Sequence, residues 1–320
     1  MPPPTILLID GYNLLYQSHF AYGDLSAPSG FPTGAMHGFF MKMGRIKKSI
    51  GGPTKVLVTL DGLPLYDEFS SYASRIVSSQ VSLSEEAPSR KALWPSYKEN
   101  RNAMPEDLAR QILPLAIILD AVGCGVVVGN SVVEADDLLA SCATEASKAG
   151  YPVVVGSMDK DLLYLLKDPH VRVFHLGTNV FLDAAHVRTK YGVSPDQMLD
   201  LLALTGDTVD NIPGVPKWGN VTAAKWLNAM GDLEHVLQRA HEIPGVAGKN
   251  LQNHVALART ARQLTELRTD IPWNVFSFLS QDRTDYPLAH TLLTELGLHQ
   301  ALKQCIPEEH RHVATQTYAY

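Results

Sequence analysis

The sequence predicts an α/β protein in which a mostly parallel sheet is covered by helices and followed by a helical C-terminal region. Two patterns predict this class. Up to about residue 175, short apolar segments rich in β-branched residues alternate with helical segments, and from about residue 183 the pattern is mainly helical. A chain of 320 residues, 45% hydrophobic and 19% charged, is long enough for roughly two domains with cores of their own.

The expected strands are short apolar runs, as a parallel sheet buried on both faces requires. They are residues 5–9, 55–60, 125–128, 151–156 and 171–175. Helices are expected at residues 33–49, with Thr33 as the N-cap, and at residues 134–149.

We expect a domain boundary near residue 180, which divides the chain into residues 1–180 and 181–320. Residues 66–104 fit neither a strand nor a helix, and their many serines indicate a long excursion from the sheet. In the second part, the loop at residues 211–219 (NIPGVPKWG) precedes a helix that begins at residue 220 or 221.

Composition and spacing exclude several classes of protein. No apolar run reaches the roughly 18 residues of a membrane-spanning helix, and the N-terminus lacks the basic region and cleavage site of a signal peptide. The cysteines (Cys124, Cys142 and Cys305) have neither the number nor the spacing of a disulfide framework or a zinc finger. We therefore expect reduced thiols, an intracellular protein and no membrane association.

Acidic residues gather in short clusters close to the expected strand ends. Nine of them form the set Asp10, Asp61, Glu134, Asp136, Asp137, Asp159, Asp161, Asp207 and Asp210. The net charge is −6, but without this set the remaining 24 acidic residues are outnumbered by 27 basic ones. Because cations bound to the set would remove its repulsion, the net charge does not exclude an anionic partner such as nucleic acid.

These carboxylates are expected to meet at one edge of the sheet. Asp10 and Asp61 directly follow strands, and ligands of an open parallel sheet bind beyond the carboxyl ends of its strands. Taken singly, each acidic residue has an ordinary explanation as a turn residue or a helix cap. At a shared edge, however, so many carboxylates can stay ionised only with cations among them, which predicts a metal site.

The ligand type indicates the metal. Oxygen ligands alone favour Mg²⁺ or Mn²⁺, and no His or Cys has ligand spacing for Zn²⁺ within these segments. Two such ions about 4 Å apart can activate a water and stabilise the leaving oxygen of a phosphodiester. The set therefore predicts metal-assisted phosphoryl chemistry on an unspecified substrate. The GxxxxGK[ST] phosphate loop is absent, so ATP use is not indicated.

Taken together, the segments resemble the 5′→3′ exonuclease and flap endonuclease family, especially the N-terminal nuclease domain of bacterial DNA polymerase I and its free-standing bacterial and phage relatives. The motifs are LIDGYN (8–13), PTGAMHG (32–38), LDG (60–62), YKENR (97–101), VEADDLL (133–139), SMDKDLLYL (157–165), LTGDTVDNIPGVP (204–216) and, more weakly, LTELRTDIPW (264–273). The resemblance covers roughly residues 5–275. It implies a PIN-like nuclease core with an arch insertion at about 66–104, then a helical DNA-binding region with a helix–hairpin–helix loop at about 205–230.

The resemblance also assigns the nine carboxylates as metal ligands. The family pattern divides them into a tighter group of Asp10, Asp61, Glu134, Asp136 and Asp137 and a second group of Asp159, Asp161, Asp207 and Asp210. The implied activity is hydrolysis of DNA phosphodiesters at 5′ ends and 5′ flaps by a two-metal-ion mechanism, in which a metal-activated water attacks the scissile phosphate.

Lys98 and Arg101 match the family's basic pair at the base of the arch. This match implies catalytic roles, in which the two cations neutralise and orient the scissile phosphate. Tyr97 is expected to stack on a base of the frayed DNA end. Without the motif, a solvated polar face would be the better explanation of this segment.

The hairpin loop is expected to direct backbone N–H groups toward duplex phosphates without reading the DNA sequence. The residues concerned are Gly214, Val215, Lys217, Gly219 and Thr222. Family hairpins often also hold a K⁺ ion through carbonyl groups. Here Lys217 stands where a glycine is usual and Val221 where a lysine is usual, and an ordinary Pro-Gly turn is the alternative interpretation.

A further departure from the family lies between LDG and YKENR. The Ser-rich stretch is longer than usual there, and no arginine stands near Tyr66 and Asp67, where the family often has one. The stretch could lengthen the arch or bind a partner, but we interpret it as a loop without a role of its own.

Three alternatives remain open. The first is a DNA-binding accessory protein of the same fold with weak or no activity. The second is a phosphatase with an aspartyl nucleophile, but Asp10 is followed by Gly11 and Tyr12 and not by the required Asp-x-Asp. The third is a ribonuclease of a related fold, against which the hairpin loop favours duplex DNA.

The expected partners are DNA with a free 5′ end or flap and, since the chain carries no polymerase-sized extension, a separate DNA polymerase. We further expect a monomer in the cytoplasm, associated with the nucleoid, and leave an organelle open as the alternative.

Overall fold

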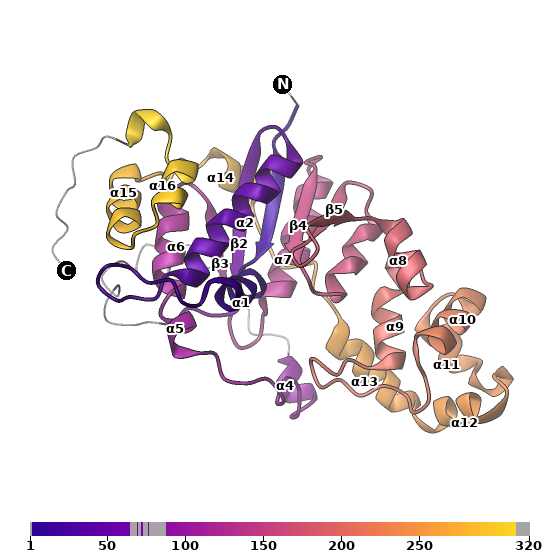
Figure 1. Cartoon of the computed structure of the whole chain (residues 1–320). Coiled ribbons are helices and arrows are strands. Elements are labelled where there is room, and N and C mark those ends of the chain that lie inside the picture. The colour runs from indigo at the N-terminus through magenta and orange to yellow at the C-terminus, as the bar shows by residue number, and fades with distance from the viewer. Residues whose placement is uncertain (1, 65–68, 70–71, 73–75, 77–87, 312–320) are drawn as a thin grey trace.

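A six-stranded sheet with the order β3-β2-β1-β4-β5-β6 forms the centre of the computed structural model (Figure 1). The structure describes residues 2–64, 69, 72, 76 and 88–311. The strands are β1 (Thr5–Asp10), β2 (Thr54–Leu60), β3 (Gly125–Val128), β4 (Val153–Ser157), β5 (Val171–His175) and β6 (Val180–Leu182). All neighbours pair in parallel except β5 and β6, which are antiparallel. The predicted mostly parallel sheet is confirmed, and β6 is an addition that the sequence patterns did not indicate.

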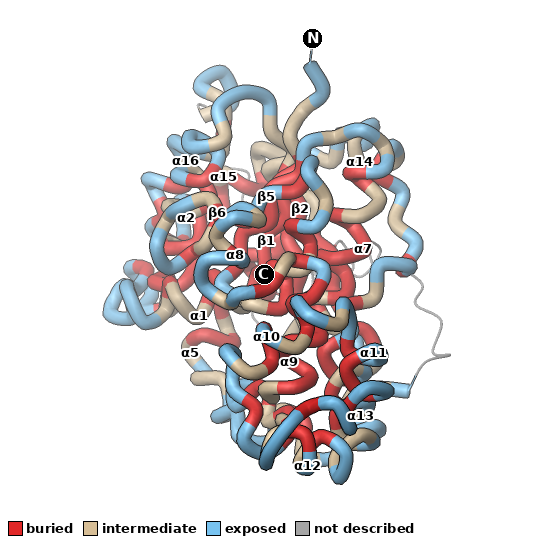
Figure 2. The backbone as a smooth tube through the Cα atoms, turned by 90° about the vertical axis from the view of Figure 1, so that its right-hand side faces the viewer, coloured by how far each residue is buried: buried red, intermediate tan, exposed pale blue. Residues whose placement is uncertain are grey.

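The two faces of the sheet bury two separate apolar clusters. In β1, Ile6 and Leu8 belong to one cluster, whereas Leu7 and Ile9 belong to the other, because successive side chains of a strand point to opposite faces. One face is covered by α1 (Gly11–Tyr22), α2 (Gly34–Ile50) and α6 (Ile112–Ala121). The other is covered by α7 (Ala135–Lys148), the 3₁₀ helix Asp161–Lys167 and α9 (Met198–Thr205). Figure 2 shows the strands as the buried centre between these layers.

The start of α2 differs from the expectation. Thr33 is the N-cap residue, but its side chain makes no capping hydrogen bond. Instead, the carboxamide oxygen of buried Gln111 accepts hydrogen bonds from the N–H groups of Ala35 (2.9 Å) and Met36 (3.2 Å). A distant side chain therefore satisfies the first free N–H groups of the helix, a contact that the local sequence does not reveal.

The second half of the chain begins with a helical region and then returns to the sheet. The helical region holds α8 (Ala184–Tyr191), α9, α10 (Asn220–Met230), α11 (Leu233–Gln238), α12 (Gly245–Asn253) and α13 (Val255–Thr265), with 3₁₀ turns at Pro195–Gln197 and Ala240–Glu242. The chain then forms α14 (Val275–Ser280), α15 (Tyr286–Glu295), α16 (His299–Cys305) and the 3₁₀ turn Glu308–His310.

The last helices belong to the α/β core and not to the helical region. Leu292 of α15 and Ala301 of α16 lie in the apolar cluster of α2 and α6, and Figure 1 places α15 and α16 on the opposite side of the molecule from α10–α12. The expected division into 1–180 and 181–320 therefore differs from the structure in two respects. The sheet continues to residue 182, and part of the second segment covers the first.

Between β2 and β3 the described residues form the short helices α4 (Arg90–Leu93) and α5 (Glu106–Ala109) ahead of α6. Most of the Ser-rich stretch, including Tyr66 and Asp67, lies outside the described residues. Within the described residues, no helix combines the length and apolar character needed to cross a membrane.

The cap of α2 gives a stability test. We expect Gln111→Met to lower the free energy of unfolding by about 1–3 kcal/mol, because two buried N–H groups lose their acceptor while the side-chain volume is kept. Urea denaturation measures the effect. Gln238→Met, at an exposed glutamine of α11, is the matched control and should change the stability by less than about 0.5 kcal/mol. Equal effects of the two substitutions would contradict the capping role.

Candidate active site

The strand order reverses at β1, and the first carboxylate of the site lies at that point. Asp10 ends β1 and caps α1. It accepts hydrogen bonds from the Asn13 N–H (3.0 Å) and the Ser157 hydroxyl (2.8 Å). Burial, together with the nearby charges of Asp159 and Asp61, raises the pKa of Asp10 to about 7. The site therefore occupies the crevice in which open parallel sheets bind ligands.

Asp61 and Asp136 extend the site from β2 and from the start of α7. Asp61 accepts a hydrogen bond from the N–H of Ala135 (2.8 Å), the first residue of α7 and the neighbour of Asp136. Burial raises the pKa of Asp136 well above its ordinary value, and the charges of Asp159, Asp10 and Asp61 act in the same direction. Asp10 at the end of β1, Asp61 after β2, Asp159 after β4 and Asp136 at the start of α7 are thus close enough to repel one another, as the sequence predicts.

A second group of carboxylates follows β4. Asp159 accepts a hydrogen bond from the Asp161 N–H (2.9 Å). Burial, Asp159 and Asp207 raise the pKa of Asp161 well above its ordinary value. Lys160 offsets part of this repulsion, because its ammonium lies 2.7 Å from a carboxylate oxygen of Asp207.

The predicted catalytic cations lie against predicted metal ligands. We call residues 89–101 the arch-base segment. Within it, Lys98 Nζ is 2.8 Å from Glu134 Oε2 and 3.9 Å from Asp210 Oδ2, and Arg101 forms an ion pair with Asp210. The two cations therefore lie directly beside Glu134 and Asp210, two of the carboxylates predicted to bind metal ions.

The arch-base segment is joined to the loop at residues 208–211 by hydrogen bonds. The Lys98 N–H donates to the Asp210 carbonyl (2.9 Å), and the side chain of Asn211 donates to the Ser96 carbonyl (2.7 Å). A third bond runs from Asn100 to the Thr208 carbonyl (2.7 Å). Lys98 has a φ of 56°, a left-handed conformation that costs free energy in a residue other than glycine and persists when its surroundings enforce it.

Tyr97 requires a correction. The expected stacking on a DNA base needs an exposed ring, but the Tyr97 side chain is buried, and the whole residue is only 5% exposed. Its hydroxyl lies 3.1 Å from Glu134 Oε2, toward which it donates a hydrogen bond. The turn that brings Lys98 to Glu134 also directs the Tyr97 ring into the apolar cluster of α7, so Tyr97 supports Glu134 instead of contacting DNA.

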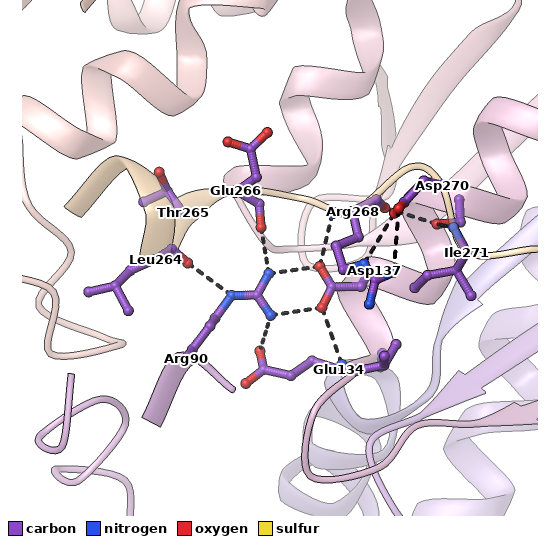
Figure 3. A network of polar contacts seen from close by, with 12 residues as sticks. Arg90, Glu134, Asp137, Leu264, Thr265, Glu266, Arg268, Asp270 and Ile271 are labelled. Carbon is purple, nitrogen blue, oxygen red and sulfur yellow. Dashed lines mark hydrogen bonds and ion pairs between the residues drawn. The ribbon is translucent and has the colours of Figure 1, made fainter. Parts of the chain in front are cut away.

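Asp137 is the predicted metal ligand that the structure does not place in the carboxylate group. It is fully buried and forms a two-pronged ion pair with Arg90, at distances of 2.7 and 2.8 Å (Figure 3). Its two oxygens also accept the N–H groups of Arg268 (3.0 Å) and Glu134 (3.3 Å). Because helix geometry turns Asp137 about 100° from Asp136, the two neighbours face different surroundings.

The remaining eight carboxylates fit divalent cations chemically, although they do not form a finished ligand sphere. In the described part of the chain, no three His, Cys, Asp or Glu side chains are already arranged around one point as metal ligands. Hydrogen bonds and ion pairs hold several of the carboxylates in place of a metal. Nevertheless, Asp161 Oδ1 is buried without a hydrogen-bond partner, and burial raises the pKa values of Asp10, Asp136, Asp159 and Asp161. All eight candidate donors are carboxylates. This is the donor set that Mg²⁺ or Mn²⁺ prefers.

The hairpin loop lies in the helical region between α9 and α10. Val215 is buried, and its N–H donates to the Leu204 carbonyl (2.8 Å), so neither its side chain nor its N–H is free for the expected contact with a DNA phosphate. Gly214 packs so closely that an added Cβ would lie 2.3 Å from the Thr205 carbonyl carbon. Lys217 is exposed with a φ of 68°, the left-handed conformation that a glycine at this position would adopt more easily.

The start of α10 completes the loop. Gly219 is exposed as the N-cap of α10, and Thr222 is half-buried in its first turn. The N-terminus of a helix favours anions because its first N–H groups are free of intrahelical partners. The structure thus places Lys217, Gly219 and Thr222 close together along one loop and helix start.

Sequence reasoning missed three residues that support the site. Ser157 donates to Asp10, Lys160 pairs with Asp207, and Arg90 pairs with Asp137. Lys160 lies between two predicted ligands in the SMDKD motif, which could have drawn attention to it. No local pattern distinguishes Arg90 from a solvated arginine.

Comparison with known proteins identifies the family. A family model described as the N-terminal resolvase-like domain of 5′-3′ exonucleases matches residues 78–192, and one described as their C-terminal SAM fold matches residues 193–284. The chain belongs to the 5′-3′ exonuclease family. It is 30% identical over 277 residues to a 5′-3′ exonuclease of Buchnera aphidicola, a match that covers 84% of this chain and 88% of that protein. The resemblance inferred from the sequence is confirmed.

Further relatives of this 5′-3′ exonuclease family member include a larger protein. The chain is 33% identical over 269 residues to DNA polymerase I of Rhizobium leguminosarum, covering 83% of this chain and 25% of the polymerase. Among solved structures, a bacteriophage T5 flap endonuclease in complex with DNA and metal ions matches with a TM-score of 0.61 and 19% identity, covering 94% of this chain and 96% of that one. That likeness confirms the predicted fold class.

The repulsion within the carboxylate group predicts a response to metal and pH. The pKa of Asp10, about 7, lies above that of an aspartate in an unfolded chain, so protonation favours the folded state. Without metal, the stability contributed by Asp10 should therefore fall as the pH rises from about 4 through about 7. We expect Mg²⁺ or Mn²⁺ to raise the Tm, and more so at pH 8 than at pH 6. Thermal unfolding with and without the ion tests this, and an unchanged Tm at both pH values would contradict it.

Lys98 gives a test of the arch-base cations. We expect Lys98→Ala to lower the single-turnover cleavage rate by about 10²–10³-fold, because a positive charge next to the scissile phosphate is lost. DNA affinity should fall much less. Lys91→Ala, at an exposed lysine of the same segment, is the control and should leave both quantities unchanged. If Lys98→Ala weakened binding as much as cleavage, Lys98 would be a binding residue only.

Proposed function

We propose that the protein is a structure-specific 5′ nuclease that hydrolyses DNA phosphodiesters at 5′ ends and 5′ flaps. The observation that carries the proposal is the group of buried and half-buried carboxylates that follow β1, β2 and β4 and begin α7, with basic side chains beside it. The family membership supports it. An accessory protein without activity would have no reason to gather eight buried or half-buried carboxylates at one edge, since the repulsion between such charges costs stability.

The ions we propose are Mg²⁺ or Mn²⁺, two in number, and divalent-metal dependence is general in the family. Asp10, Asp61, Glu134 and Asp136 would hold one side of the site, and Asp159, Asp161, Asp207 and Asp210 the other. When bound, two such ions supply an activated water and stabilise the leaving oxygen of the phosphodiester.

The protein's own residues prepare the site for an anion. Lys98 and Arg101 are paired with Glu134 and Asp210, so their charges are held at the site before any substrate arrives. A phosphodiester that enters would compete for both cations and loosen their hold on the two carboxylates. Once Lys98 and Arg101 bind the phosphodiester, Glu134 and Asp210 would be freer to bind metal ions. Substrate entry and metal binding would thereby favour each other.

DNA duplex binding is proposed for the helical region, through Lys217 and the backbone N–H groups of Gly214, Gly219 and Thr222. The proposal is supported by the exposure of Lys217 and Gly219 and by the free helix start of α10. A K⁺ ion held by carbonyls of this loop remains part of the proposal.

The physiological setting is also proposed. The DNA polymerase I relatives carry the matching region as 25–30% of their length, which supports action beside a separate DNA polymerase. We propose a monomer in the cytoplasm that works on the nucleoid.

Cleavage of a 5′-flap substrate tests the proposed function. We expect Mg²⁺-dependent cleavage by the parent protein and a rate at least about 100-fold lower for Asp136→Asn, because the variant loses a charged metal ligand. Asp196→Asn, at an exposed aspartate far along the chain, should cleave like the parent. A parent protein that binds the flap but never cuts it would establish the accessory-protein alternative, and RNA flaps in parallel would test the ribonuclease alternative.

A further inference from the structure

Arg90 uses its whole guanidinium group to join three segments of the chain. From the arch-base segment, Nε donates to the Leu264 carbonyl (2.9 Å) and Nη2 to the Glu266 carbonyl (2.5 Å), both at the end of α13. Nη1 and Nη2 donate to the two oxygens of Asp137, and Nη1 lies 3.3 Å from Glu134 Oε2 (Figure 3). Five N–H groups therefore face five acceptors, and the side chain is only 11% exposed.

The acceptors of Arg90 belong to the start of α7, which also carries metal ligands. Asp137 is the third residue of α7 and Glu134 its N-cap, so they flank Ala135 and Asp136. Glu134 Oε2 is approached by Arg90, Lys98 and the Tyr97 hydroxyl. Three groups of the arch-base segment thus converge on one oxygen of Glu134, whose side chain also forms a capping box with Asp137.

The same face of α7 holds the chain that leaves the helical region. Asp137, Ser141 and Glu145 are spaced four residues apart and line one face of the helix. The N–H groups of Arg268, Ile271 and Trp273 donate in turn to Asp137 (3.0 Å), Ser141 (3.2 Å) and Glu145 (3.1 Å). We call residues 264–275 the return segment. It runs along α7 from end to end, and Arg90 binds its first residues.

We infer that Arg90 is a positioning residue of the nuclease reaction and that Asp137 is its partner rather than a metal ligand. Through Asp137 and Glu134, Arg90 holds the start of α7 in register with the arch-base segment, which carries Lys98 and Arg101, and with the end of α13. Lysine cannot replace it, because an ammonium has three donors in a tetrahedral arrangement and cannot meet five planar acceptors. The inference rests on the proposed function for its effect on cleavage.

The test is a double-mutant cycle of Arg90→Lys and Asp137→Asn. If Asp137 acts through Arg90, each substitution should lower the single-turnover rate by about 10–100-fold, and the double variant should be no slower than the slower single one. The Mn²⁺ concentration for half-maximal rate should rise in all three variants, whereas duplex affinity without divalent ions should stay within about threefold, since the hairpin loop is untouched. Multiplied effects in the double variant, as expected for an independent metal ligand, would overturn the inference.

A second readout does not need cleavage. Glu134 placed wrongly should bind metal less well, so the Mn²⁺ concentration for half of the Tm increase should rise in Arg90→Lys and Asp137→Asn, even after their lower starting Tm is taken into account. An unchanged metal titration in both variants would show that the pair only supports the fold, which would overturn the inference.

Arg268→Ala is the matched control, because the Arg268 side chain pairs with exposed Asp270, and only its backbone N–H contacts Asp137. It should behave like the parent in every measurement, and a loss equal to that of Arg90→Lys would overturn the assignment to the guanidinium. If the parent protein itself does not cut DNA, the proposed function fails, while the metal titration still decides the role of Arg90.

Discussion

Repulsion among buried carboxylates is the constraint on which the rest of this molecule depends. Parallel pairing of β1 with β2 and β4 brings strand ends with Asp10, Asp61 and Asp159 to one edge. Burial at this edge, together with the charges of Asp159 and Asp61, raises the pKa of Asp10 to about 7. A folded chain can keep such a group ionised only if cations are close, and side chains from elements outside the sheet supply some of them.

Those cations come from two places, the arch-base segment and the turn that follows β4. Lys98 belongs to the arch-base segment, which is bonded to the loop at residues 208–211. Lys160 lies between Asp159 and Asp161 and reaches Asp207. The packing of the surrounding segments therefore decides where the cations of the site lie. The left-handed backbone conformation of Lys98 costs free energy, and it persists because that packing enforces it.

Much of this was predictable from the sequence because it follows from local patterns. β1, β3 and β5 lie within a residue of the expected runs, and Asp10 and Asp61 lie at the predicted edge, since the period of a buried strand and the edge rule need no distant information. What the sequence could not reveal depends on pairs far apart in the chain. Gln111 caps α2, and Arg90 forms an ion pair with Asp137. The residues next to these side chains in the sequence give no sign of either contact.

Tyr97 and Asp137 show the limit of transferring roles along a motif. Both stand in matching positions, yet burial decides what each side chain can touch: the Tyr97 ring lies in an apolar cluster, and Asp137 faces away from Asp136. The last helices show the same limit at the scale of domains. The pattern of apolar residues in α15 and α16 is that of an ordinary amphipathic helix. Only the folded structure shows that these two helices cover α2 and α6.

The return segment has a consequence for the modular design of this protein. Its backbone N–H groups donate hydrogen bonds to Asp137, Ser141 and Glu145 in turn, so it is bonded along one whole face of α7. A version of the chain cut after α13 would leave these three acceptors to water and expose the apolar surface that α15 and α16 cover. The helical region is consequently an insertion held at both ends by the catalytic core, and it cannot be exchanged or removed as an independent module.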